Sequence, residues 1–286
     1  MRYHGMRVGE AKNPGPPGCM RVSGLNVQSL NCFLDDKRIL SGQSDLLICS
    51  ETCATSFVEQ KATKILHAAG RHVAFGKAVD KRVFKDGRDC NTKGQAKGVA
   101  ICSACPIRKC HQPWSDESWS TSRVSDCYIL TQNGQVRVFA VYGYRQGFPD
   151  FQIKNETLLR EVLARASTVD IPCLIVGDLN CDLQSLQIWP DMQQTGWKDA
   201  ALVQAAWDQD LPDYTFKESR LDYILFNAKA ASAFRGFNVS AVPETDHRHG
   251  EFHASGCLLC DMEDWKQGGS LFYRAIATWS APGRLA

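Results

Sequence analysis

Carboxylate and amide side chains follow a buried apolar run near residue 175 of this 286-residue chain. Residues 171–176 are mostly apolar and β-branched, which predicts a buried strand that ends at Gly177. Asp178 and Asn180 come next, and a tight turn at Gly177 would project both into one cleft. Because α/β sheets carry their chemistry at the carboxyl ends of strands, this pair is a candidate for catalysis. By itself, the pattern also fits an ordinary strand followed by an Asx-type turn.

Three other predicted strands end at polar residues in the same way. Asn26 closes an alternating strand, Glu51 follows the apolar run 46–49, and Tyr142 closes the second strand of a hairpin that turns at residues 133–134. In isolation, Glu51 fits a solvated surface glutamate and Tyr142 fits a tyrosine at a strand edge. Their repetition at successive strand ends makes them candidates for one site.

Further titratable groups lie toward the C-terminal end. Asp222 belongs to the predicted strand 219–226, where its apolar neighbours indicate a buried acid. Asp246 and His247 form a pair just before another predicted strand. An imidazole beside carboxylates suits proton transfer near neutral pH.

The sequence predicts helices and one long loop between these strands. Helices are predicted at residues 31–43, 56–69 and 155–167, and the last has the spacing of an amphipathic helix. Residues 77–97 are basic and lack periodicity, which predicts a loop that either contacts phosphates or is simply solvated. We expect a disordered leader at 1–20, one domain at 21–260 and a tail at 261–286 without an assigned element.

The composition and net charge are ordinary for a globular protein. Hydrophobic residues make up 44% and charged residues 22%, and the net charge is +2, so only local patches would favour a nucleic acid or a membrane. No apolar run is long enough to span a bilayer, and the N-terminus lacks a signal-peptide core. We expect a soluble, intracellular protein whose thirteen cysteines are free thiols in a reducing compartment.

The ordered set of strand-end residues resembles the endonuclease/exonuclease/phosphatase superfamily over residues 21–258. This superfamily includes deoxyribonuclease I, exonuclease III type apurinic endonucleases and the endonuclease domains of non-LTR retrotransposons. Residues 220–225 resemble the nuclease and retrotransposon branch. The resemblance implies an α/β fold, a four-layer α/β sandwich of two mixed β-sheets packed face to face with flanking helices, whose loops form the site at one edge. The set comprises Asn26, Glu51, Tyr142, Asp178, Asn180, Asp222, Asp246 and His247.

The resemblance also implies a metal cofactor. Glu51 resembles the principal Mg2+ ligand, Asn26 and Asp246 resemble its neighbours in the metal site, and Mn2+ is a possible substitute. A hard cation held by carboxylates and waters suits phosphodiester hydrolysis, because negative charge builds on the phosphate oxygens and on the leaving alkoxide.

The remaining residues resemble the groups that act on the phosphate and the attacking water. Tyr142 resembles the phosphate-contacting tyrosine, and Asp178 with Asn180 resembles the Asp-x-Asn that orients water and phosphate. His247 resembles the catalytic histidine, and Asp222 resembles the acid that buttresses it. Either Asp178 or His247 is a candidate general base, and the sequence leaves both open.

The implied activity is an endonuclease that nicks double-stranded DNA as a monomer, without a membrane partner, and nuclear residence follows from that substrate. A phosphatase or phosphodiesterase acting on an inositol phosphate, a lipid or a nucleotide is the alternative within the superfamily. A noncatalytic fragment of a retroelement polyprotein is the alternative outside enzymes. The departures are Ser50 before Glu51, where many members have glutamine, the absence of a proline after Tyr142, and the polar residues after His247.

Two zinc sites are competing hypotheses. His247, His249 and His253 would share one face of a strand, although adjacent positions on one strand rarely converge on a tetrahedral ion. Cys102 and Cys105 could pair with Cys257 and Cys260, but apolar flanks favour ordinary burial.

Overall fold

A computed structural model describes most of the chain between residues 19 and 280. The described residues are 19–27, 29–35, 44–78, 84–85, 88–89, 98–110, 114–115, 122–131, 134–210, 215, 219–242, 244–245, 252–253 and 272–280. Residues 1–18 of the predicted leader 1–20 lie outside them, as do Asp246 and His247, whereas residues 19 and 20 belong to the first strand, Cys19–Asn26.

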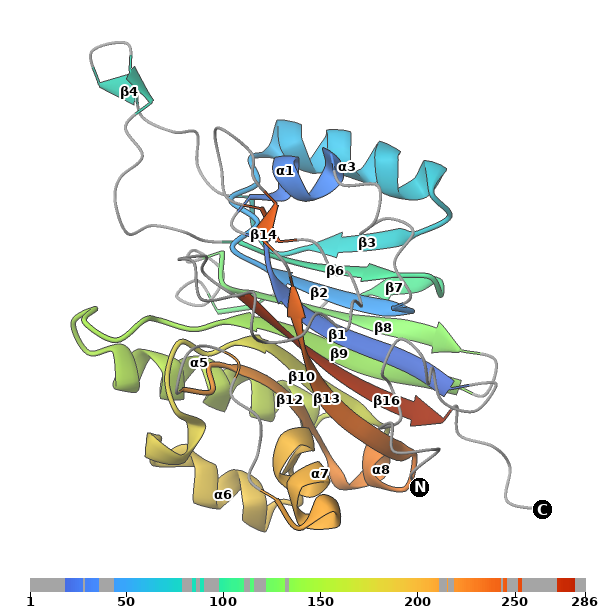
Figure 1. Ribbon diagram of the computed structural model, residues 1–286, viewed down its shortest axis with the longest axis vertical. Coiled ribbons are helices and arrows are strands. Elements are labelled where there is room, and N and C mark those ends of the chain that lie inside the picture. The colour runs from blue at the N-terminus through green and yellow to red at the C-terminus, as the bar shows by residue number, and fades with distance from the viewer. Residues whose placement is uncertain are drawn as a thin grey trace, which may run out of the picture.

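Two six-stranded sheets form the centre of the described part (Figure 1). The first sheet has the order β13 (Phe234–Val242), β16 (Phe272–Ser280), β1 (Cys19–Asn26), β2 (Leu46–Ser50), β6 (Val99–Ser103) and β3 (His72–Phe75). The second has the order β11 (Lys198–Asp199), β12 (Asp222–Phe226), β10 (Cys173–Asp178), β9 (Gly134–Tyr142), β8 (Val124–Thr131) and β7 (Ile107–Lys109). Two short antiparallel pairs are separate from both, namely β4 (Phe84–Lys85) with β5 (Arg88–Asp89), and β14 (Glu244–Thr245) with β15 (Phe252–His253).

Both sheets are mixed, and each contains one parallel pair among the described strands. β1 runs parallel to β2 in the first sheet, and β9 runs parallel to β10 in the second. The remaining neighbours are antiparallel, including the β8–β9 hairpin that was predicted around residues 133–134. A parallel pair brings two carboxyl ends to the same edge of a sheet, so each sheet presents two adjacent strand ends there.

Helices cover the outer faces of the two sheets, which completes four layers (Figure 1). The helices are α1 (Leu30–Asp35), α3 (Ser56–Ala68), α5 (Phe151–Ala166), α6 (Ile188–Gln194), α7 (Ala200–Asp208) and α8 (Ala228–Ala231), with a 3-10 turn η1 at Leu183–Ser185. One apolar cluster fills the space between the sheets, a second lies under α5 and α6, and a third lies under α1 and α3. The predicted four-layer α/β sandwich is therefore confirmed.

The central strands are buried on both faces. In β2, Leu46 and Ile48 face the cluster between the sheets, while Leu47 and Cys49 face the cluster under α1 and α3. Side chains alternate across a strand, so a strand with helices on one side and a sheet on the other must be apolar at every position. This explains why the sequence shows continuous apolar runs here.

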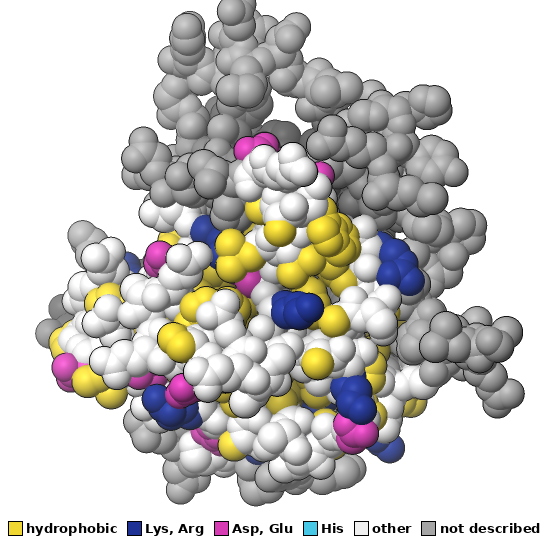
Figure 2. Space-filling view, turned by 90° about the horizontal axis from the view of Figure 1, so that it is seen from below, with side chains coloured by type: hydrophobic (Ala, Val, Ile, Leu, Met, Phe, Trp, Pro, Cys, Tyr) yellow, Lys and Arg dark blue, Asp and Glu magenta, His cyan; other side chains and the backbone are white. Residues whose placement is uncertain are grey.

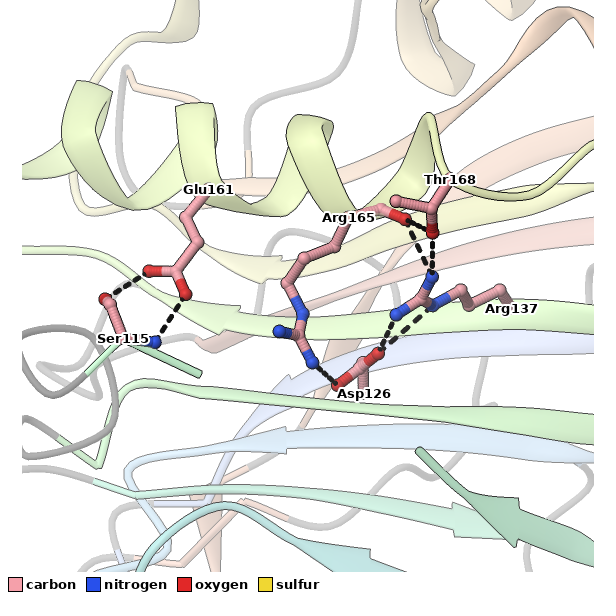
Figure 3. A network of polar contacts seen from close by, with 6 residues as sticks. All are labelled: Ser115, Asp126, Arg137, Glu161, Arg165 and Thr168. Atoms are coloured by element: carbon pink, nitrogen blue, oxygen red, sulfur yellow. Dashed lines mark hydrogen bonds and ion pairs between the residues drawn. The ribbon is translucent and has the colours of Figure 1, made fainter. Parts of the chain in front are cut away.

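A buried ion cluster attaches α5 to the second sheet (Figure 3). The Asp126 carboxylate on β8 accepts from Arg137 Nη2 at 2.7 Å and from Arg165 Nη2 at 3.3 Å. Arg137 also donates to the carbonyl oxygen of Arg165 at 2.7 Å. Near the middle of the helix, Glu161 accepts from the backbone N–H of Ser115 at 2.7 Å. The helix is thereby held at defined points over β8 and β9.

Several expectations about element boundaries need correction. Gly177 does not end the strand, because β10 continues to Asp178 in parallel register with β9. The basic segment 77–97 is not entirely a loop, since β4 and β5 pair within it. The tail left unassigned contributes β16, which lies between β13 and β1 in the first sheet.

The predicted helices lie close to their expected positions. α3 matches the prediction. α1 spans Leu30–Asp35, so it begins one residue before the predicted segment 31–43 and includes all the described residues of that segment, and α5 begins four residues earlier than expected, at Phe151. The eight cysteines described with their side chains are free thiols, as expected. None of the described helices has the length and apolar character needed to cross a membrane.

Candidate active site

The two parallel strand pairs bring four of the predicted residues to one place between the sheets. Asn26 ends β1 and Glu51 directly follows β2, while Tyr142 and Asp178 end β9 and β10 at opposing positions. Asn26 Nδ2 donates to Asp178 Oδ2 at 3.2 Å, and the Tyr142 hydroxyl donates to Glu51 Oε1. Both hydrogen bonds cross from one sheet to the other, so residues more than 90 positions apart in sequence meet at one edge.

A second carboxylate lies beside Asp178. β12 is antiparallel to β10, and Asp222 begins β12 directly opposite Asp178. The backbone N–H groups of Leu221 and Asp222 both donate to Thr215 Oγ1, at 2.9 and 3.0 Å, which fixes the start of this strand. The antiparallel register therefore adds a third strand end to the site.

Asn180 reaches the same region through the turn after β10. Its backbone N–H donates to Asp178 Oδ1 at 2.8 Å, which is the Asx-type turn that the sequence allowed. Its Nδ2 donates to the carbonyl oxygen of Gly143 at 3.3 Å. The Asx turn is thus present, and it also places the Asn180 side chain against the loop that follows Tyr142.

Two residues of the site have a left-handed backbone conformation. Glu51 has φ = 56° and Asn180 has φ = 53°. Asparagine adopts this region readily, but for glutamate it costs roughly 1–2 kcal/mol. Backbone strain of this kind persists where surrounding contacts fix the residue, and it gathers at functional sites.

Glycines allow the β9 and β10 ends to approach closely. A β-carbon at Gly177 would lie 1.8 Å from the carbonyl oxygen of Val141, and one at Gly143 would lie 2.1 Å from that of Leu179. Both contacts would be with backbone oxygens, which cannot move aside as the end of a flexible side chain could. A larger residue at either glycine would therefore push the strand ends apart. The glycine before Asp178 is required for close packing within the sheet, and the predicted tight turn lies after Asp178.

Comparison with solved structures identifies this arrangement of layers and strands. An AP endonuclease from Archaeoglobus fulgidus aligns with a TM-score of 0.58 at 16% identity, covering 90% of this chain and 98% of the other. The 3'-5' exonuclease NExo from Neisseria meningitidis aligns equally well at 17% identity, with the same coverage of both chains. The endonuclease domain of TRAS1, a telomere-specific non-LTR retrotransposon, aligns with a TM-score of 0.52 at 13% identity, covering 92% and 99%.

The chain has the endonuclease/exonuclease/phosphatase fold. No family model and no curated protein sequence matches it. The fold match covers nearly the full length of each of these three structures.

In this endonuclease/exonuclease/phosphatase fold, the site edge concentrates negative charge. Burial, together with the nearby Glu51 charge, raises the pKa of Asp178 to about 7 against the lowering effects of the Asn180 N–H, of Asn26 and of Arg123. Burial and the neighbouring Asp178 also raise the pKa of Asp222. The pKa of Tyr142 is raised by burial and by Glu51, so its hydroxyl remains a proton donor. These shifts come first from burial and second from the proximity of the acidic groups to one another.

The donor set fits a hard divalent cation. Asn26, Glu51, Asp178 and Asp222 present only amide and carboxylate oxygens, the ligands that Mg2+ prefers. Within the described residues, no three acidic, histidine or cysteine side chains are close enough to hold a metal by themselves.

Two residues that support the site were missed from the sequence. Arg123, at the start of the β8 hairpin, is buried, donates to the carbonyl oxygens of Tyr142 and Gly143 at 3.2 and 2.6 Å, and lies 4.2 Å from the ring centre of Tyr144. Nothing in the sequence around Arg123 marks it. Asn155 on α5 is also buried, and its position in the apolar stripe of a helix was a usable signal, because a polar residue there needs hydrogen-bond partners.

The predicted catalytic histidine and its neighbouring acid lie outside the described residues. Asp246 and His247 are among the residues not described, as are His249, Cys257 and Cys260 of the two zinc hypotheses. Cys102 lies buried in β6, as ordinary burial requires. The structure therefore brings together Asn26, Glu51, Tyr142, Asp178, Asn180 and Asp222, and the roles of these six residues, like those of Asp246 and His247, stay predictions.

Proposed function

We propose that this chain is a Mg2+-dependent phosphodiesterase that nicks duplex DNA. The observation that carries the proposal is the pair of contacts between the sheets, Asn26 with Asp178 and Glu51 with Tyr142, which assembles an oxygen-rich acidic edge from four strand ends. Mn2+ would serve in place of Mg2+ because it accepts the same oxygen ligands.

The residues divide into a cation side and a phosphate side. Glu51 and Asn26, with Asp246, would hold the cation. When bound, the cation would offset the charge that develops on the phosphate during hydrolysis. Tyr142 and Asn180 carry hydrogen-bond donors that suit phosphate oxygens, and Tyr142 stays protonated because its pKa is raised.

Proton transfer falls to Asp178 or His247. Asp178, with a pKa near 7, is poised to accept a proton from the attacking water, since a general base works best when its pKa lies close to the ambient pH. His247 is the second candidate, and Asp222 would hold the far side of its imidazole. In either case the Asn180 N–H fixes the orientation of the Asp178 carboxylate.

The face drawn in Figure 2 gives little further guidance on the substrate. Figure 2 shows one face of the molecule, on which lysine and arginine side chains are spread singly among acidic ones. Duplex DNA is favoured by the ordered set of site residues, and the structural match supports it: NExo was solved bound to a product DNA hairpin. NExo in that complex is a 3' phosphatase, so a phosphatase activity is the alternative tested below.

A nicking assay tests the proposal. Supercoiled plasmid, with and without an abasic site, should be nicked in the presence of Mg2+ and remain intact with EDTA, while inositol phosphates should release no phosphate. His247→Ala should slow nicking by about 10²- to 10⁴-fold. Phosphate release without nicking would favour the small-substrate phosphatase, and an unchanged rate in His247→Ala would refute the role of that residue.

Metal binding has a readout that does not depend on activity. Mg2+ should raise the melting temperature, because a ligand that binds only the folded state stabilises it by about 2.7 kcal/mol at a hundred times its Kd. Glu51→Gln keeps a hydrogen-bond acceptor for Tyr142 but removes a ligand charge, so most of this increase should disappear. Asp182→Asn, at an exposed position, is the matched control and should retain the increase. Equal shifts in all three proteins would place the cation elsewhere.

A further inference from the structure

Asn155 is a polar side chain in the apolar stripe of α5. It precedes Leu158, Leu159 and Val162 at helical spacing, and only 1% of its surface is exposed. A buried amide is costly unless its hydrogen-bonding groups are paired, so the partners of Asn155 show what it holds.

The Asn155 amide bonds to both loops that leave the parallel β9–β10 pair. Oδ1 accepts from the backbone N–H of Tyr144 at 2.6 Å, and Nδ2 donates to the carbonyl oxygen of the same residue at 3.0 Å. Nδ2 also lies 3.2 Å from the carbonyl oxygen of Leu179 and 3.3 Å from Cys181 Sγ. One side chain therefore contacts residues 143–147, the β9 loop, and residues 179–181, the β10 loop.

The β9 loop follows Tyr142 directly, the β10 loop contains Asn180, and hydrogen bonds join the two strand ends here. The backbone N–H of Gly143 donates to the carbonyl oxygen of Asp178 at 2.7 Å, and Asn180 Nδ2 donates back to the Gly143 carbonyl oxygen at 3.3 Å. Tyr142 immediately precedes the β9 loop, and Asn180 lies within the β10 loop. A shift of either loop would move a donor that faces the phosphate in the proposed function.

We propose that Asn155 is a positioning residue that fixes the β9 loop against the β10 loop and so keeps Tyr142 and Asn180 aligned for hydrolysis. This inference rests on the proposed phosphodiesterase function. Asn155 lies behind the loops, on α5, and touches no group assigned to substrate. Its loss should therefore lower kcat and leave KM nearly unchanged, because misplacement by about 1 Å can cost on the order of 10²-fold in rate.

Asn227 provides a matched control. It contacts the amino end of β10, whereas Asn155 contacts the loop that follows the carboxyl end of β10. Its Oδ1 accepts from the backbone N–H of Cys173 at 3.0 Å and from that of Ala230 at 3.1 Å, and its Nδ2 donates to the carbonyl oxygen of Ile171 at 3.0 Å. Asn227 thus fixes the amino end of β10 as Asn155 fixes the loop at its carboxyl end. Replacing either asparagine by leucine removes a comparable set of bonds, but only Asn155 is joined to the site.

Steady-state kinetics of nicking, measured on an intact oligonucleotide duplex, would separate the two positions. Asn155→Leu should lower kcat by about 10- to 100-fold with KM within about threefold, whereas Asn227→Leu should keep the kcat of the parent. Asn155→Asp is nearly isosteric and retains the acceptor for Tyr144; at this buried position its carboxyl should be protonated, so it can still donate one hydrogen bond to a loop carbonyl oxygen, and the variant should fold with an intermediate kcat. Equal kcat losses at both positions, or none in a folded Asn155 variant, would overturn the proposal.

Amide hydrogen exchange gives a readout that needs no activity. Asn155→Leu should accelerate exchange in both the β9 and β10 loops, Asn155→Asp mainly in the β10 loop, and Asn227→Leu in neither relative to the rest of the sheet. An inactive parent protein would refute the proposed function, while the exchange pattern would still decide whether Asn155 holds the loops. Unchanged exchange in both loops of Asn155→Leu would refute the positioning role even if the parent is active.

Discussion

Asp178→Asn is expected to slow phosphodiester cleavage by about 10²- to 10⁴-fold while leaving the protein folded. The contacts of the site converge on Asp178. Its carboxylate accepts hydrogen bonds from Asn26 Nδ2 and from the backbone N–H of Asn180, and Asp178 lies opposite Asp222 in the antiparallel register of β10 and β12. Asparagine keeps the shape and one acceptor oxygen but can neither accept a proton nor supply a charge to a cation. The rate of plasmid nicking at saturating Mg2+ measures the effect.

Asp182→Asn is the control for this change. Asp182 is an exposed acid four residues further along, and it accepts from the N–H of Gln184 at the start of η1. Asparagine serves equally well at such a cap, so nicking should stay close to the parental rate. If Asp178→Asn retained full activity, neither proton transfer nor metal binding by Asp178 could be part of the reaction.

The same substitution should stabilise the metal-free protein above neutral pH. The pKa of Asp178 is raised to about 7 in the folded state, against about 3.9 in an unfolded chain. Between these values the folded state binds a proton that the unfolded state has released, so this carboxyl makes stability fall as pH rises and costs free energy above about pH 7. Asp178→Asn removes this cost, and urea unfolding should show a gain of about 1–3 kcal/mol near pH 8 that vanishes near pH 4. A gain that is independent of pH would contradict the assignment.

Asp126→Asn should lower the free energy of unfolding by about 3–5 kcal/mol, the largest stability loss expected from a single change here. The carboxylate is 2% exposed and is shared by Arg137 and Arg165, whose side chains are 2% and 5% exposed (Figure 3). The amide would leave two buried guanidinium groups without a countercharge. Urea unfolding at neutral pH, followed by circular dichroism, measures the loss.

An exposed ion pair offers the comparison. Asp170 accepts from Lys229 Nζ at 2.9 Å, with side chains 85% and 55% exposed, so Asp170→Asn should change stability by less than about 0.5 kcal/mol. If Asp126→Asn cost no more than Asp170→Asn, the buried cluster would not stabilise the attachment of α5. Because α5 carries Asn155, a large loss at Asp126 without any loss of kcat below the melting transition would show that the two ends of the helix act independently.

The sequence was sufficient to predict the central strands and several of the helices. Continuous apolar runs such as 46–49 and 171–176 predict strands buried on both faces, and the period of 155–167 predicts a helix with one apolar stripe. These patterns follow from local geometry, because side chains alternate across a strand and repeat every 3.6 residues on a helix. The four-layer sandwich itself was predicted from the ordered set of strand-end residues through the resemblance, and the structure confirms it.

The sequence also named the polar residues at the strand ends but could not place them. Asn26 and Asp178 are 152 positions apart, and only the packing of two sheets face to face brings them within hydrogen-bond distance. The parallel register within each sheet and the antiparallel start of β12 decide which strand ends share an edge. Register depends on contacts between distant segments, which no local pattern contains.

The supporting residues depended on tertiary structure most of all. Arg123 carries no mark in the sequence, because its partners are backbone carbonyls of a neighbouring strand end. The tail that was left unassigned became the inserted strand β16, since a strand between two partners is stabilised by hydrogen bonds on both sides. The sequence by itself determined the chemistry available to this protein, and only the packing of the two sheets decided that the acids, amides and phenol meet at one edge.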